Sequence, residues 1–225
     1  MSVRNIKNLV LKDLSLLTGP VVIIFYIIPA LMLFIPAYPR PATMFYLLVS
    51  IMNMFSFDLM GKDHEFSGLL PVKKKESVLA RLAAMMLLQI LLLVFTAPFA
   101  ILSNYLLDRW DAANNPAGMN TNIVSYAIIL VFYGIFNLIV LPGAYKKQFK
   151  VSLRSIIGLF VFIVGATITE NLICRPSGGI LFLNGTSGHD LLLQTPILIG
   201  ALILYCVINC IAYIRARNNY KKTDI

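Results

Sequence analysis

The chain has 225 residues, of which 59% are hydrophobic and only 13% are charged. A soluble domain carries about 25% charged residues, so this composition excludes an ordinary water-soluble protein. The net charge of +9 would suit a nucleic-acid-binding protein, but the basic residues occupy separate segments between long apolar runs. That distribution favours contact with anionic lipid headgroups, and we expect membrane lipids rather than nucleic acid as partners.

The N-terminal segment, residues 1–15, has the pattern of an amphipathic helix. Val3, Ile6 and Val10 fall on one helical face, whereas Lys7 and Lys12 fall elsewhere. A helix of this kind lies in the membrane interface with its apolar face toward the acyl chains. We therefore expect an interfacial helix on the cytoplasmic side.

Six apolar stretches follow, and a bilayer core needs about 20 apolar residues in a helix. The expected spans cover residues 16–36, 41–60, 82–106, 123–144, 155–174 and 192–214. Asp58 and Glu170 interrupt the second and fifth spans near their ends. The sequence predicts an all-α polytopic membrane protein with one transmembrane domain over residues 1–225.

The basic residues set the orientation, because cytoplasmic loops retain Lys and Arg and translocated loops lack them. Alternating sides at each span puts 16 of the 19 basic residues on the side of the N-terminus. The other side holds only Arg40, Arg109 and Arg175. We expect both termini in the cytoplasm and the protein in the plasma membrane.

The sequence has no Gly-x-x-x-x-Gly-Lys-Ser/Thr phosphate loop, which excludes ATP binding of the usual kind. The two histidines, His64 and His189, fall on opposite sides of the membrane and cannot share a metal. The cysteines show no metal-ligand spacing, and Cys206 and Cys210 are expected as small packing residues. We expect no metal and no cofactor bound by this chain.

Glu170 is the one carboxylate clearly inside an expected span. A charge at mid-membrane costs about 2.5–3.5 kcal/mol on insertion scales, although its place near the external end lowers that cost. One interpretation is an acid that lines a pore or an external gate. The other is a carboxylate that reaches the external interface or bonds a neighbouring helix, and both remain open.

The segment between the second and third spans, residues 61–81, carries a distinctive pattern. It reads Leu-Leu-Pro-Val-Lys-Lys-Lys-Glu over residues 69–76, after Asp63 and Glu65, and then Val-Leu-Ala-Arg-Leu over residues 78–82. This resembles the corresponding loop of small ABC-2 type transporter permeases, although Arg81 stands where lysine is commoner. The six spans and the N-terminal helix agree across the chain. Among members, the chain most resembles permeases that export amphipathic peptides such as phenol-soluble modulins, and those of lantibiotic-type immunity.

The resemblance implies a permease subunit that is not itself an enzyme. Two permeases, identical or homologous, would pair in a bacterial plasma membrane above two copies of a separate ATPase that holds ATP and Mg. Residues 61–81 would carry a short coupling helix, with contacts to the ATPase from Asp63, His64, Glu65, Phe66, Leu69, Leu70 and Pro71. Without the resemblance, the same loop reads as a solvated segment that only sets topology.

The expected cargo is an amphipathic or antimicrobial peptide carried out of the cell. Two alternatives stay open. The same architecture could export a drug or a lipid, or the chain could act alone as a channel or secondary transporter.

Overall fold

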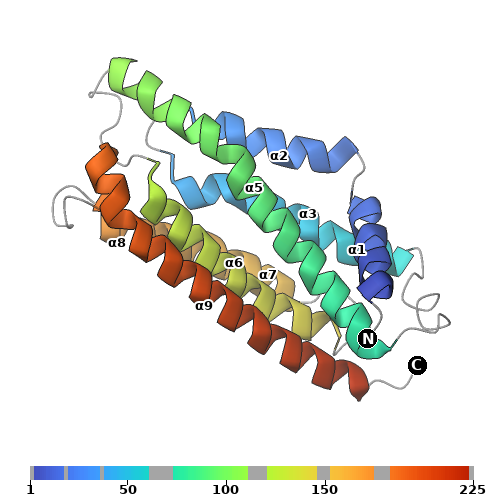
Figure 1. Ribbon diagram of the computed structural model, residues 1–225. Helices are drawn as coiled ribbons and strands as arrows, with labels where there is room; N and C mark the ends of the chain where they lie inside the picture. Colours follow the sequence, from blue (N-terminus) through green and yellow to red (C-terminus); the bar gives the residue numbers. More distant parts are fainter. Residues whose placement is uncertain are drawn as a thin grey trace.

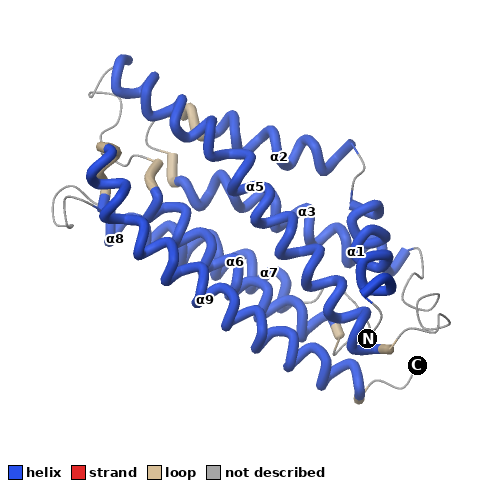
Figure 2. Tube along the Cα trace, viewed as in Figure 1, coloured by secondary structure: helices blue, strands red, loops and turns tan. Residues whose placement is uncertain are grey.

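The computed structural model describes residues 3–17, 20–35, 38–60, 73–110, 121–145, 153–174 and 183–222. All the regular structure in these residues is helical, as Figure 2 shows, so the all-α prediction is confirmed for them. The elements are α1 (Val3–Leu17), α2 (Pro20–Met32), α3 (Arg40–Met60), α5 (Lys74–Trp110), α6 (Ile123–Ala144), α7 (Leu153–Phe160), η2 (Val161–Gly165), α8 (Ala166–Cys174) and α9 (Gly188–Lys221).

Four of the described segments are long and apolar enough to cross a membrane: Lys74–Leu106, Ile123–Ala144, Leu153–Ile173 and Gly188–Lys221. They correspond to the last four expected spans, and Ile23–Met32 is a shorter apolar helix within the first. The protein is therefore membrane-embedded, whereas six spans remain a prediction. Helix α5 begins at Lys74 rather than near residue 82. Residues 74–81 of the expected loop therefore form the first turns of this helix.

The long helices run alongside one another, and Figure 1 shows both termini at the same end of the bundle. Helix α9 packs along α6, and α7, η2 and α8 also pack against α6. Helix α3 contacts α1, α2, α5, α6, α7, η2 and α8, which makes it the central element. We call the end with both termini the terminal end and the other the distal end.

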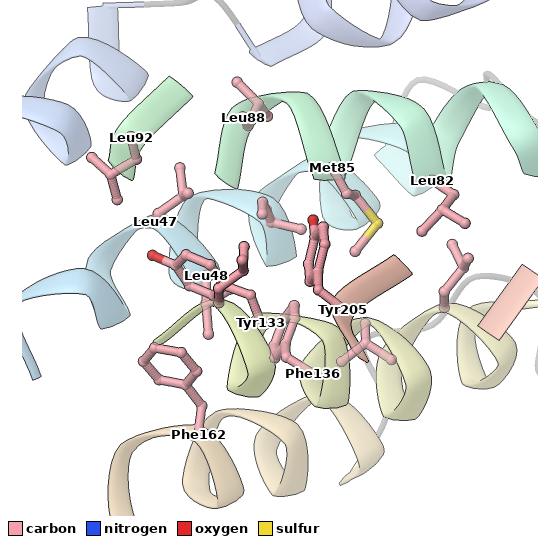
Figure 3. Close-up of a cluster of buried hydrophobic side chains, with 14 of the residues drawn as sticks. Leu47, Leu48, Leu82, Met85, Leu88, Leu92, Tyr133, Phe136, Phe162 and Tyr205 are labelled. Atoms are coloured by element: carbon pink, nitrogen blue, oxygen red, sulfur yellow. The ribbon is translucent and has the colours of Figure 1, made fainter. Parts of the chain in front are cut away.

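The core between these helices is apolar and aromatic (Figure 3). Leu47 and Leu48 from α3, Met85 from α5 and Tyr133 from α6 are fully buried. The ring of Tyr133 stacks on Phe162 of η2 with centroids 5.1 Å apart. These contacts tie the fifth expected span to the centre of the bundle.

The outer faces are apolar as well, as expected for helices that face lipid. On α9, Leu192 is 74% exposed and Ile203 is 60% exposed. Cys206 and Cys210 of α9, expected as small packing residues, are exposed and do not pack within the described part of this chain. A residue on a wholly apolar helix gives no sequence signal of which face turns inward.

Helix α1 extends over Val3–Leu17. Among its described side chains, Leu9 and Asp13 are buried, while Leu11 is 53% exposed. The helix packs on α5 and α3. Contacts with α5 and α3 therefore fix which face of α1 turns toward the bundle. The place of α1 in the membrane interface stays a prediction.

Candidate functional site

Buried polar side chains form three groups along the bundle. They are the Glu170 site near the distal end, an amide network in the middle, and the Asp13–Arg81 pair at the terminal end. Polar and ionisable groups are rare within membrane helices, and those that occur face the bundle interior and mark functional positions. Each group joins helices that are far apart in the sequence.

The Glu170 site joins α8 to the start of α3. Glu170 is 1% exposed, and its Oε2 accepts a hydrogen bond from the backbone N–H of Arg40 at 3.1 Å. Arg40 is the first residue of α3, where backbone N–H groups lack helical partners and a negative charge is stabilised. Glu170 is thus bonded to a neighbouring helix rather than exposed. Whether it gates transport is a separate prediction.

The side chain of Arg40 is also drawn inward and is 1% exposed. Its Nη1 donates to the carbonyl oxygen of Leu33 at 3.0 Å, and the hydroxyl of Ser103 donates to the same oxygen at 2.6 Å. The carbonyl of Leu33, just beyond the end of α2, therefore accepts bonds from α3 and α5. The Glu170 site holds four helices together at the distal end.

A π-helical turn places Glu170 within its span. The turn covers Val161–Gly165, and such bulges are frequent at functional sites. A Cβ added to Gly165 would lie 2.5 Å from Cε1 of Phe132, so glycine permits the close approach to α6. Beyond the turn, the hydroxyl of Thr169 donates to the carbonyl of Gly165 at 2.7 Å.

The amide network joins α5, α6 and α9. Gln89 and Asn137 exchange two hydrogen bonds, of 2.9 Å and 3.0 Å, and Asn137 also donates to Oδ1 of Asn209 at 2.9 Å. The hydroxyl of Tyr205 donates to Oε1 of Gln89 at 2.8 Å. All four side chains are buried, with exposed fractions of 2% or less. Mutual pairing avoids the cost of unpaired amides in an apolar core.

The Asp13–Arg81 pair joins α1 to α5. Oδ1 of Asp13 lies 3.3 Å from Nη2 of Arg81, and both side chains are 6% exposed. The guanidinium of Arg81 also lies over the ring of Phe55, 5.5 Å from its centroid. This pair fixes the N-terminal helix against the base of α5 and α3.

The expected ATPase-coupling residues Asp63, His64, Glu65, Phe66, Leu69, Leu70 and Pro71 lie outside the described residues. The described chain resumes at residue 73 and enters α5. Its first turn is held to α9, since Nζ of Lys74 lies 5.3 Å from the ring centroid of Tyr220. Among the described residues of the motif, Arg81 lies in a buried ion pair, and Val78 and Leu82 are buried in the core.

No group of three or more His, Cys, Asp or Glu in the described part of the chain could hold a metal ion. An apolar pocket of about 420 Å³ lies between α6, α8 and α9, next to the turn of α8 that carries Glu170. Its walls include Phe132, Thr169, Ile173, Leu183 and Gly200. Such a surface can accept an apolar chain but offers no chemistry beyond that.

Sequence reasoning missed most of these groups. Gln89, Asn137 and Asn209 were visible as amides inside apolar stretches, which is the signal that identifies buried polar residues in a membrane protein. Asp13 and Arg40 carried no such signal, because each borders an apolar stretch and reads as a residue at the membrane surface. Their partners are 68 and 130 residues away.

The long apolar helices, with polar groups turned inward, define a helical membrane protein. The chain belongs to the ABC-2 family transporter proteins, whose family model matches residues 8–221. Members of this family are membrane transport components that normally work with an ABC ATPase. Comparisons with curated proteins and with solved structures gave no significant match.

Proposed function

We propose that the chain is the permease subunit of an ABC exporter that carries amphipathic or antimicrobial peptides out of a bacterial cell. It works with two copies of a separate ATPase and with a second permease, identical or homologous. The observation that carries this proposal is family membership over nearly the whole chain, in a protein whose sequence lacks an ATP-binding loop. The ATP and Mg belong to the ATPase, so the chain itself needs no cofactor.

The proposed topology has six spans and two cytoplasmic termini. Support comes from the distribution of basic residues and from the position of both termini at one end of the bundle (Figure 1). Single cysteines in residues 108–122 and 176–191 should react with a membrane-impermeant maleimide in intact cells. Cysteines in residues 62–76 and 216–225 should react only after permeabilisation. Labelling of residues 62–76 from outside would contradict the topology.

Residues 62–76 are the proposed docking element for the ATPase. Phe66, Leu69 and Leu70 supply an apolar anchor, and such anchors carry most of an interface's energy, with losses of about 2 kcal/mol or more on truncation. Asp63, His64, Glu65 and Pro71 complete the element. The contacts of Arg81 with Asp13 and of Lys74 with Tyr220 would pass its movement to α1 and α9.

A pull-down with the cognate ATPase tests the docking element. The Phe66→Ala, Leu69→Ala, Leu70→Ala triple variant should recover less ATPase than the wild type and uncouple hydrolysis from export. The matched control replaces Lys73, Lys74 and Lys75 with Gln, which removes charge close to the membrane and should disturb membrane placement or topology more than ATPase recovery. Equal recovery with the apolar triple variant and the wild type would refute the assignment.

Glu170 is the proposed external gate. Its bond to the first N–H of α3 (Arg40) joins two helices at the distal end, so a movement that opens this end must break it. Glu170→Gln should change the export rate while ATPase recovery stays at the wild-type level. Unchanged export at equal expression would favour a purely structural acid.

The alternatives separate in two experiments. Co-purification with an ATPase distinguishes an ABC permease from a channel or secondary transporter that acts alone. Export from vesicles loaded with a labelled amphipathic peptide, compared with a hydrophobic drug or a fluorescent lipid, identifies the cargo. Selective export of the drug or the lipid would overturn the peptide assignment and leave the permease assignment standing.

A further inference from the structure

A cavity at the terminal end lies between α6, α7 and α9, has a volume of about 510 Å³, and is lined by basic and amide side chains above an apolar floor. Arg154 comes from the first turn of α7, and Arg215 and Asn218 come from the last turns of α9. Leu138 and Ile139 of α6 line its inner part. We call this cavity the arginine crevice.

The guanidinium groups of Arg154 and Arg215 line the crevice, and the part of the chain that the structure describes supplies no counterion for them. Arg154 and Arg215 are both exposed, and neither forms an ion pair with any carboxylate in the described part of the chain. None of the described residues that line the crevice is acidic. Two arginines from different helices at one cavity therefore leave a local positive charge that an anion would neutralise.

Local packing holds the crevice open. A Cβ added to Gly143 would lie 2.9 Å from Cδ of Arg154, so the aliphatic stem of Arg154 rests over the last turn of α6 because that position has no side chain. On the other side, Nδ2 of Asn219 donates to the carbonyl oxygen of Pro142 at 2.7 Å. That bond fixes the end of α9 against the end of α6 and sets the width of the cavity.

The walls of the crevice change from apolar in its inner part to basic at the terminal end of the bundle. Leu138 and Ile139 belong to the membrane-spanning segment Ile123–Ala144, whereas Arg154 begins the next such segment and Arg215 follows the last exposed apolar residue of α9, Ile214. An apolar floor under a basic rim matches a molecule with a hydrocarbon chain and an anionic head. Basic pockets between membrane helices on the cytoplasmic side bind such headgroups.

We propose that the arginine crevice binds an anionic glycerophospholipid, with its phosphate between Arg154 and Arg215 and an acyl chain along Leu138 and Ile139. The lipid bridges α6, α7 and α9 at the end of the bundle where the chain meets the cytoplasm. The inference goes beyond the proposed export function and rests only on its proposed topology, because neither cargo nor ATPase takes part in the binding.

Native mass spectrometry of the full-length protein in a non-ionic detergent tests the site. Phosphatidylglycerol and phosphatidylcholine with identical acyl chains serve as probes, and inorganic phosphate and glycerol 3-phosphate serve as soluble competitors. Each guanidinium near the headgroup contributes about fivefold to the binding constant. The Arg154→Gln, Arg215→Gln double variant should therefore bind phosphatidylglycerol roughly thirtyfold more weakly than the wild type.

The matched control is Lys221→Gln, Lys222→Gln, which removes the same charge from exposed positions on the same end of α9 that do not line the crevice. It should bind the lipid like the wild type. The Arg154→Lys, Arg215→Lys variant keeps the charge and should retain most of the binding, which separates loss of the site from loss of the fold.

Four results would overturn the proposal. The first is equal binding of phosphatidylglycerol by the double variant and the wild type. The second is an equal loss of binding in the Lys221→Gln, Lys222→Gln control. The third is binding of phosphatidylcholine by the wild type as strong as that of phosphatidylglycerol. The fourth is displacement of the lipid by soluble phosphate at the same concentration, which would show a simple anion site. Where the first of these results is found, loss of the ATPase from the double variant in a pull-down would assign the crevice to the ATPase.

Discussion

Breaking the Asp13–Arg81 pair should destabilise the protein far more than removing both partners. The two side chains are each 6% exposed and their charged atoms lie 3.3 Å apart. Loss of one partner from a buried ion pair leaves an uncompensated charge and costs about 3–5 kcal/mol. We therefore expect Asp13→Leu to lower the free energy of unfolding by that amount.

Replacement of Arg81 adds a second loss. Its guanidinium lies 5.5 Å from the ring centroid of Phe55, and a cation–π contact of this kind contributes about 0.5–2 kcal/mol. The charge left behind in Arg81→Met is that of Asp13. Arg81→Met should thus cost about 1 kcal/mol more than Asp13→Leu.

The Asp13→Leu, Arg81→Met double variant removes both charges of this pair. Apolar replacement of a whole buried pair is often neutral or stabilising. Its free energy of unfolding should lie within about 2 kcal/mol of the wild type. Reversible unfolding in mixed detergent and sodium dodecyl sulfate, followed by circular dichroism, measures all four proteins. Costs that simply add in the double variant would refute the reasoning.

Lys12→Met provides the internal control. Nζ of Lys12 lies 3.9 Å from the same carboxylate, but this side chain is 29% exposed. Exposed ion pairs contribute about 0–1 kcal/mol. Lys12→Met should therefore lower the free energy of unfolding by about 1 kcal/mol at most. A loss as large as that of Arg81→Met would mean that burial does not decide the strength of these pairs.

Three further predictions concern the rest of the bundle and use the same unfolding assay. Tyr205→Phe removes one hydrogen bond to Gln89 and should cost about 0.6 kcal/mol, the average for such bonds in membrane proteins. Gly165→Leu forces a side chain into the space of Phe132 and should cost about 1–3 kcal/mol through overpacking. Asn122→Ala removes the N-cap of α6, whose side chain accepts a bond from the third helical N–H at 2.9 Å, and should cost about 1 kcal/mol.

Each of these variants has a counterpart that separates the stated cause from general damage. Tyr46→Phe removes a hydroxyl for which the described chain shows no hydrogen bond, and should be neutral. Gly200→Leu adds a side chain where a Cβ meets no atom within 4 Å, and should also be neutral. Asn122→Ser loses the same bond from Nδ2 to the carbonyl of Leu183 but keeps a capping oxygen, and should be more stable than Asn122→Ala. Equal losses in a variant and its counterpart would contradict the prediction concerned.

The comparison of expected and observed elements shows which signals are local. The span expected over residues 123–144 coincides with α6 (Ile123–Ala144), because Asn122 caps its start and apolar residues fill it. Helix α5 begins earlier than its apolar stretch because lysine and glutamate are good helix formers and continue the helix beyond the membrane. The burial of Asp13 could not be read from the sequence of α1, because this polar residue turns inward to a partner on another helix.

The candidate site divides in the same way. Glu170 could be singled out from sequence, since one carboxylate inside an apolar run is conspicuous. Its partner could not, because Arg40 reads as a residue at the membrane surface and meets Glu170 across 130 residues of chain. The coupling residues 63–71 were inferred from a motif alone and remain a prediction.

Hydropathy and the placement of basic residues, by themselves, determined that this protein is helical and embedded in a membrane, and they indicated its orientation. Those properties follow from transfer of short segments into a bilayer and need no knowledge of distant contacts. Only the tertiary structure decided which faces turn inward, how Gln89 meets Asn137, and how Arg154 and Arg215 come to share one cavity. Nearly uniform apolar helices can be rotated without changing their sequence pattern, so the packing of the bundle selects the pairs.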